Sequence, residues 1–170
     1  MVDVYDKEKK LNYTTFPEKY TQNIWKRFQM SGQGPYFGQR MWFGLVSNTW
    51  TSLYTNTALT LHPQYHPEKI QSAIDRYDNE IRRVYSVIEF HLNKTGTPYL
   101  VGDKCTFADL MWVPWTLMAT QLPGTEFGTK FEEKYPKTAA WHRSLLGRES
   151  VKRVVDLMNE HAPDYMRFRA

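Results

Sequence analysis

One stretch of the sequence, Leu100-Val-Gly-Asp-Lys-Cys-Thr-Phe-Ala-Asp-Leu110, constrains the fold more than any other. Thr106 can accept a hydrogen bond from the amide of Asp109, and the Asp109 carboxylate can accept one from the amide of Thr106, which is the reciprocal capping box of a helix N-terminus. Cys105 and Leu110 stand at the positions of a hydrophobic staple around this box. The stretch therefore predicts a helix that begins directly after Thr106.

The residues after this cap are apolar nearly all round the predicted helix, from Leu110 to Met118. A helix of this kind is stable in water only when protein surrounds it. Pro114 lacks the N–H that would bond the carbonyl of Leu110, so we expect the helix to kink or loosen there. The segment predicts a central buried helix whose aromatic residues are, by default, part of the core.

The longest periodic segment predicts a helix from Pro67 to about Leu92. Its apolar residues recur at spacings of three and four and form one continuous stripe. The flank beside the stripe is charged and polar, and there Asp78 can pair with Arg82 one turn further on. We expect this flank to be a solvated face.

The segment before it predicts a helix in two parts. Tyr20, Ile24 and Phe28 recur at helical spacing until the glycine-containing run 31–35 interrupts the pattern. Segment 36–45 is rich in aromatic residues and is expected to continue the helix after this break.

The C-terminal third predicts a loop and two further helices. Residues 121–129 contain proline and glycine and read as a loop, 136–146 as a helix that opens on proline, and 149–160 as another helix. The inward-facing residues of the last helix are expected to be Val151, Val154, Val155 and Met158. No segment predicts a strand, so the expected fold class is all-α, a bundle of five to six helices with short connections.

Composition excludes several classes of protein. A chain of 170 residues is one domain by size, and its net charge of +4 comes from interspersed acids and bases, which does not favour nucleic-acid binding. No apolar run is long enough to span a membrane. The single cysteine cannot form an internal disulfide, which fits a reducing compartment, and we expect the cytoplasm.

The sequence lacks the local motifs that identify nucleotide-binding, metal-binding or catalytic sites. Gly32, Gly34 and Gly38 match neither the dinucleotide nor the phosphate-loop spacing. His62 and His66 are four residues apart, but Pro63 between them is unfavourable for a helical metal-binding pair. The sequence therefore predicts no catalytic residue, no metal site and no tightly bound cofactor.

Several motifs nevertheless stand in a familiar order: Gln29-Met-Ser-Gly-Gln-Gly-Pro35, Gly38-Gln39, Ala73-Ile-Asp-Arg-Tyr77, Asn79-Glu-Ile-Arg-Arg83 and Leu100–Leu110. They resemble the C-terminal helical domain of cytosolic glutathione transferases. The resemblance is closer to the fungal branch that includes the yeast nitrogen-catabolite regulator, and to the bacterial nu-class enzymes. It implies that the helices form the glutathione transferase C-terminal-type bundle.

The resemblance also implies a domain organisation. Residues 1–15 are expected to be a linker remnant, 16–161 the helical domain and 162–170 a tail. In this family glutathione is a cosubstrate that sits mainly on an N-terminal thioredoxin-like domain, which orients the thiolate. This sequence has no counterpart of that domain, so we expect a truncated protein that is inactive alone, because activating a nucleophile contributes more than pocket walls do.

The family's site residues carry over to few positions. Arg76 matches the nu-class arginine that reaches across a homodimer to glutathione, and its planar guanidinium suits a peptide carboxylate. Candidate walls of the pocket for a small electrophile, by position in the family, are Gln33, Tyr36, Gln39, Trp112 and Trp115. For each of these a purely structural role remains the default interpretation. Thr106 and Asp109 are expected to be structural.

Residues 46–64 depart from the family pattern, because removing them joins Gly38–Leu45 directly to Tyr65–Ile70 at the usual spacing. Two interpretations stay open. The segment can be a retained intron, since its codons can supply a donor, a branch point and an acceptor in frame. It can equally be a genuine surface loop, which a protein accommodates at small entropic cost.

The resemblance thus predicts a truncated glutathione transferase-like protein whose helices form the electrophile pocket and much of the dimer interface. The parent chemistry is attack by the glutathione thiolate on an electrophile or a disulfide. The alternative is a non-catalytic regulatory or scaffold module of the same fold that binds a protein partner.

Overall fold

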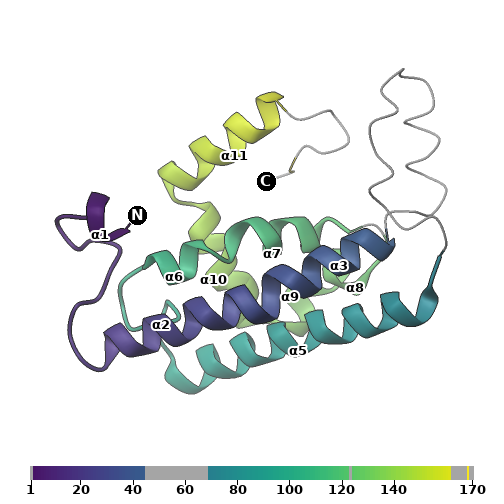
Figure 1. The fold of residues 1–170 in the computed structure, drawn as a ribbon, viewed down its shortest axis with the longest axis horizontal. Helices are drawn as coiled ribbons and strands as arrows, with labels where there is room; N and C mark the ends of the chain where they lie inside the picture. The colour runs from purple at the N-terminus through teal and green to yellow at the C-terminus, as the bar shows by residue number, and fades with distance from the viewer. Residues whose placement is uncertain (1, 45–68, 123, 162–167, 169–170) are drawn as a thin grey trace.

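The computed structural model describes residues 2–44, 69–122, 124–161 and 168, and this part of the chain is helical without a strand (Figure 1). The fold class is all-α, as predicted. The helical segments are α1 (Val2–Tyr5), α2 (Glu18–Phe28), the π-helical η1 (Gln29–Gln33), α3 (Gly34–Gly44), α5 (Gln71–Thr95), α6 (Phe107–Leu110), α7 (Val113–Thr120), α8 (Glu126–Thr129), α9 (Phe131–Lys134), α10 (Pro136–Leu146) and α11 (Glu149–His161).

Segments α2, η1 and α3 form one continuous helix that lies along α5 (Figure 1). The predicted break at residues 31–35 was wrong. Gly34 keeps right-handed helical angles, with φ −51° and ψ −58°, and a single π-helical turn carries the chain through the glycines. Packing on both sides supports these residues, and such packing overrides a low helix propensity.

The helix predicted from the spacing of Tyr20, Ile24 and Phe28 forms as α2, but this spacing does not mark its buried face. Tyr20 and Ile24 are 60% and 64% exposed, whereas Gln22 and Trp25 are 2% and 6% exposed. The polar Gln22 is accommodated inside because its amide donates to Asn12 Oδ1 and accepts from a backbone amide. A buried amide of this kind is stable when its hydrogen bonds are made.

Helix α5 supplies the centre of the core. Ile81, Val84, Tyr85 and Ile88 are fully buried, which confirms the predicted stripe. The described helix begins at Gln71, and Pro67, the predicted start, lies outside the described residues.

The predicted pair of Asp78 with Arg82 does not form. Asp78 pairs with Arg40 of α3, and Arg82 pairs with Glu126 of α8. Partners on neighbouring helices therefore replace the partner one turn away. Part of the flank is thus in contact with other helices and is not a fully solvated face.

The buried helix predicted after Thr106 exists in two pieces, α6 and α7, with a turn at Met111 and Trp112 between them. Pro114 occupies the first turn of α7, where its missing N–H leaves no hydrogen bond unmade. The expected loosening near Pro114 is confirmed. Trp112 is fully buried and Leu117 is 5% exposed, so these pieces are central to the bundle.

Residues 121–129 are not entirely a loop, because one helical turn, α8, forms from Glu126 to Thr129. The following turn, α9, was not predicted either. Phe127 and Phe131 point into the core from these turns and are 1% and 8% exposed. Their aromatic side chains stabilise short helices that the proline and glycine content of the segment disfavours.

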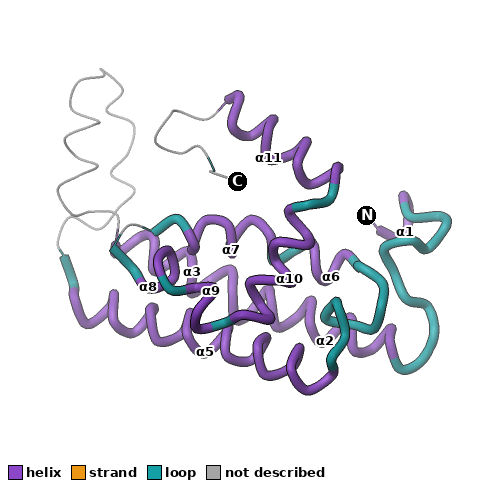
Figure 2. The backbone as a smooth tube through the Cα atoms, turned by 180° about the vertical axis from the view of Figure 1, so that it is seen from behind, coloured by secondary structure: helices purple, strands orange, loops and turns teal. Residues whose placement is uncertain are grey.

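Helices α10 and α11 match their predicted ranges within one residue, and α11 projects away from the bundle (Figure 2). The prediction that its apolar residues face inward was wrong for Val154 and Met158, whereas Val151 packs against the core. Val154, Leu157 and Met158 are 55%, 54% and 43% exposed, and α11 has no buried residue. Its apolar stripe therefore lies at the surface of this chain.

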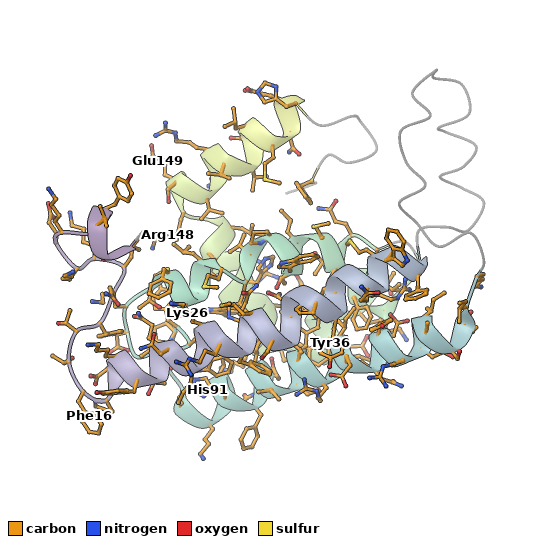
Figure 3. All side chains as sticks on the ribbon, in the orientation of Figure 1. Phe16, Lys26, Tyr36, His91, Arg148 and Glu149 are labelled. Carbon is orange, nitrogen blue, oxygen red and sulfur yellow. The ribbon has the colours of Figure 1, made fainter. Side chains whose placement is uncertain are left out.

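The residues before α2 are attached to the bundle by Lys104. Its ammonium donates to the carbonyls of Lys9 and Asn12, at 3.0 and 2.8 Å, and lies 4.2 Å from the centre of the Tyr13 ring. The amide of Phe107 also donates to the carbonyl of Leu11. By contrast, Phe16 is 81% exposed and points away from the bundle (Figure 3).

Candidate functional site

The Asp109 carboxylate holds the start of the central helix in place. The predicted capping box forms. Oδ2 accepts from the amide and the hydroxyl of Thr106, at 2.8 and 3.0 Å, and Oδ1 accepts from the amide of Leu100 and from Nε1 of Trp141, at 2.9 and 3.1 Å. Four donors thus compensate a carboxylate with no exposed surface.

The two glutamines of the π-helical segment form a buried polar network against α7. Gln33 is fully buried, accepts from Gln29 Nε2 at 3.1 Å, and donates to Thr116 Oγ1 at 3.0 Å and to the carbonyl of Trp112. Gln29 also donates to the carbonyl of Met111, at the turn between α6 and α7. The network fixes the long helix against the interrupted central helix.

Trp115 and Tyr36 lie at partly exposed positions beside this network. The Trp115 ring runs along the glycine face of α3, where a Cβ on Gly38 would lie 3.3 Å from the ring. Tyr36, which is labelled in Figure 3, is also partly exposed. Its ring centre is 6.2 Å from that of Tyr77 on α5. The small residues of α3 therefore make room for an aromatic wall.

The candidate pocket residues divide into two groups. Gln33 and Trp112 are fully buried, so they support the surface without forming it. The indole Nε1 of Trp112 has no hydrogen-bond partner in the described part of the chain. Tyr36, Gln39 and Trp115 reach the surface. The structure brings Gln33 and Trp112 together, whereas Tyr36 leans toward α5.

Arg76 differs from the other charged side chains of α5. Those side chains all have partners: Asp75 accepts from Gln71, Asp78 and Arg82 pair with other helices, Glu80 pairs with Arg83, Glu89 accepts from α10, and Lys94 lies over Phe90. Arg76 is exposed and makes no hydrogen bond or ion pair with any described residue. With no acceptor among the described residues, its guanidinium can bind an anion.

The buried titratable groups are not arranged for nucleophilic chemistry. Burial raises the pKa of the Cys105 thiol to about 11, so the nucleophilic thiolate is scarce at neutral pH. Burial also raises the pKa of Tyr85. Burial lowers the pKa of His142 to about 4, which keeps this imidazole neutral. These groups are components of the core.

The described residues contain neither a metal-binding cluster nor a membrane-spanning helix. That part of the chain holds no group of three or more histidine, cysteine or acidic residues placed to bind a metal. Nor does any helix in it have the length and apolarity needed to cross a membrane.

Sequence reasoning missed three polar contacts that shape the site. The glutamine network leaves one signal, the spacing of four between Gln29 and Gln33. The ion pair of Arg40 with Asp78 and the bond of Trp141 to Asp109 join residues far apart in the chain. No local pattern could have indicated those two contacts.

The comparisons with known proteins agree with this geometry. Residues 45–149 match the family described as "Glutathione S-transferase, C-terminal domain". Among solved structures, the glutathione transferase URE2P6 from Phanerochaete chrysosporium, in complex with oxidized glutathione, is 40% identical with a TM-score of 0.75, over 95% of this chain and 63% of that one. Ure2p5 from the same organism, cocrystallized with 1-(S-glutathionyl)-2,4-dinitrobenzene, is 33% identical with a TM-score of 0.74, over 94% and 64%.

Curated relatives point the same way. The glutathione S-transferase-like protein tpcF of Aspergillus fumigatus is 38% identical over 135 residues, which are 76% of this chain and 51% of that protein. Glutathione S-transferase 2 of Schizosaccharomyces pombe is 35% identical over 161 residues, 89% of this chain and 61% of that protein. The chain thus spans between about half and three-fifths of the length of these relatives.

Proposed function

The chain belongs to the glutathione S-transferase family through its C-terminal domain, and from this premise we propose that it forms the electrophile-binding half of a glutathione-dependent transferase or disulfide reductase. In this proposal glutathione is the cosubstrate, and no cofactor is tightly bound. The described residues include no activated thiol or base, and burial raises the pKa of the Cys105 thiol. We therefore propose that the chain alone does not turn over substrate.

The observation that carries the proposal is the free guanidinium of Arg76. The other charged side chains of α5 have partners, whereas Arg76 has none among the described residues. An unpaired arginine presents a planar fork of donors that suits a peptide carboxylate. We propose that Arg76 binds a carboxylate of glutathione held by a second subunit.

The second subunit would cover apolar surface that this chain leaves exposed. Tyr20, Ile24 and Met30 of the long helix and Val87 and Phe90 of α5 are between 38% and 68% exposed. Exposed apolar side chains on two adjacent helices favour burial against a protein surface. A homodimer through α2 and α5 would bury them and bring Arg76 toward the partner's glutathione.

We propose that Trp115, Tyr36 and Gln39 contact the electrophile, because they are the candidates that reach the surface. Gln33 and Trp112 would act as positioning residues. Gln33 fixes the π-helical segment against α7, and Trp112 packs against the rings of Trp25 and Phe28.

A chimera tests the proposal. The thioredoxin-like half of URE2P6 is joined to the N-terminus of this chain. Two reactions are then measured: conjugation of glutathione to 1-chloro-2,4-dinitrobenzene, and reduction of mixed disulfides of glutathione, which yields the free thiol and oxidised glutathione. We expect turnover by the chimera and none by the chain alone. In the chimera, Arg76→Ala should raise the KM for glutathione about tenfold, the loss of one charge-assisted contact.

Arg153→Ala is the matched control, because Arg153 is an exposed arginine on α11 without a partner among the described residues. It should leave the KM for glutathione unchanged. A folded chimera without turnover, or equal effects of the two substitutions, would contradict the proposal. A folded but inert chimera would favour a non-catalytic regulatory or scaffold module.

A further inference from the structure

A pocket of about 370 Å³ lies where the end of α3, the first turns of α5 and the short α8 meet. Its polar lining includes Arg40 and Gly44 from α3, Lys69, Asp78 and Arg82 from the α5 region, and Glu126 from α8. The volume is in the range of sites for small organic molecules. None of the family-derived candidate residues lines it.

The pocket is separate from the proposed glutathione contact. Its α5 residues, Gln71, Ile74, Asp78 and Arg82, follow one another at spacings of three and four and therefore share one face of the helix. Arg76 is two residues from both Ile74 and Asp78, which places it on another side of α5.

The charges around the pocket leave cationic donors in excess. Three cations and two carboxylates line it. Both carboxylates already have partners, since Asp78 binds Arg40, and Glu126 binds Arg82 as well as Lys134 outside the lining. The hydrogen bonds from Lys134 and Arg82 lower the pKa of Glu126, so this carboxylate stays ionised and paired.

Arg40 is the most buried of these cations, with 8% of its surface exposed. It bonds Asp78 through Nε, and its two terminal nitrogens have no acceptor among the described residues. Gly44 leaves room for this guanidinium, because a Cβ there would lie 1.7 Å from Nη1. Within the described residues two donors of this buried guanidinium are therefore unused, and such a group is poorly compensated without an acceptor.

We propose that this pocket binds a small organic acid, with its carboxylate on the terminal nitrogens of Arg40 and on the Lys69 ammonium at the rim. The pair of parallel donors on a guanidinium matches the two oxygens of a carboxylate. Lys69 is exposed and has no partner among the described residues, so it adds a second positive charge at the entrance.

Titration of succinate into the chain labelled with ¹⁵N-glycine tests this site at constant ionic strength. Of the nine glycines, Gly44 and Gly124 line the pocket, whereas Gly96 and Gly147 lie at the ends of α5 and α10. We expect saturable shifts of the first two amide signals and none of the last two. Succinamide, which has the same shape without charge, should cause no saturable shift.

Two substitutions test the assigned donors. Lys69→Ala removes an exposed charge, and Gly44→Ala displaces the flexible end of Arg40 while the Gly124 signal still reports binding. Each should weaken succinate binding at least about fivefold, as expected for loss of a charge-assisted contact. Lys94→Ala, an exposed lysine at the far end of α5, and Arg76→Ala should leave it unchanged.

Shifts that stay linear in succinate concentration, or that Gly96 and Gly147 share, would overturn the proposal. Equal weakening by Lys94→Ala would also overturn it, because the effect would then be one of net charge. The site is independent of the chimera experiment, since succinate binding is measured in the chain alone and Arg76 takes no part in it.

Discussion

Asp109 shows how one residue joins segments that the sequence keeps far apart. Its carboxylate accepts hydrogen bonds from Leu100, from Thr106 at the helix start and from Trp141 of α10. The local half of this arrangement follows from the capping-box pattern. The bond from the Trp141 indole does not, because it depends on the packing of α10 against the central helix.

We predict that Asp109→Ala lowers the free energy of unfolding by about 3–5 kcal/mol, since it leaves buried donors of Leu100 and Trp141 without an acceptor. Thr106→Ala should cost about 1–2 kcal/mol through loss of capping alone. The double variant should cost less than the sum, because both changes remove the same bonds. Urea unfolding measures all three, and additive losses would show that the two residues act independently.

His142 gives the protein an acid sensitivity at the residue scale. Burial lowers the pKa of His142 to about 4, below its ordinary 6.5. The unfolded chain therefore binds more protons between these values, and stability falls as pH drops through this window. We predict a loss of about 2 kcal/mol between pH 7.5 and 5, measured by urea unfolding.

His142→Gln should remove most of this pH dependence, because the side chain no longer titrates. His161→Gln is the matched control, since His161 is exposed at the end of α11 and should leave the slope unchanged. An unaltered slope in His142→Gln would assign the acid sensitivity to other groups.

At the scale of elements, the sequence predicts where helices form better than which face they bury. The stripe of α5 was confirmed because neighbouring helices of the same chain cover Ile81, Val84 and Ile88. In α2 and α11 the same kind of periodicity ends in exposed residues such as Ile24 and Val154. Periodicity identifies an apolar face, but it does not say whether this chain or another surface covers it.

The site shows the same division. The positions of Thr106 and Asp109 could be predicted because a capping box is local. The network of Gln33 with Thr116, and the pair of Arg40 with Asp78, could not, because each joins residues at least 38 positions apart. Polar contacts between helices depend on how the helices are arranged in space, and a local sequence pattern does not determine that arrangement.

Helix α10 depends on a side chain from another helix for its N-terminal cap. Glu89 of α5 accepts from the amides of Lys137 and Thr138, at 3.1 and 2.8 Å, and from the Thr138 hydroxyl at 2.9 Å. An acidic side chain at this end also interacts favourably with the helix dipole. Glu89 therefore performs the role that an N-cap residue normally has within its own helix.

We predict that Glu89→Ala lowers the free energy of unfolding by about 1–2 kcal/mol and speeds hydrogen exchange of the Lys137 and Thr138 amides. Glu133→Ala is the control, because Glu133 is exposed and has no partner among the described residues. Equal exchange rates in the two variants would mean that the first turn of α10 is stable without this cap.

At the scale of the whole molecule, residues 46–64 belong to the connection between α3 and α5 and lie outside the described residues. They are either a translated intron or a genuine surface loop. Gly44 and Lys69, on either side, line the same pocket, so a short connection can join them. We predict that deletion of residues 46–64 preserves helical content and leaves stability unchanged or higher by about 1 kcal/mol, because loop closure becomes less costly.

Circular dichroism and thermal unfolding measure this, and sequenced transcripts should mostly join Leu45 to Tyr65 if the segment is a retained intron. A deletion that unfolds the bundle, together with transcripts that always keep the segment, would identify it as an evolved loop. The two measurements separate the interpretations, because one concerns the message and the other the folded chain.

The attachment of the leading residues by Lys104 has a consequence for how the molecule meets a protease. Trypsin binds the residues around a scissile bond in an extended conformation. One possible scissile bond joins Lys9 to Lys10, and it contains the carbonyl of Lys9. That carbonyl accepts from Lys104, while Asp6 accepts from the amides of Lys10 and Leu11. Cleavage at this bond therefore requires that the residues before α2 first separate from Lys104. The rate of cleavage thus measures how often these residues detach from the bundle.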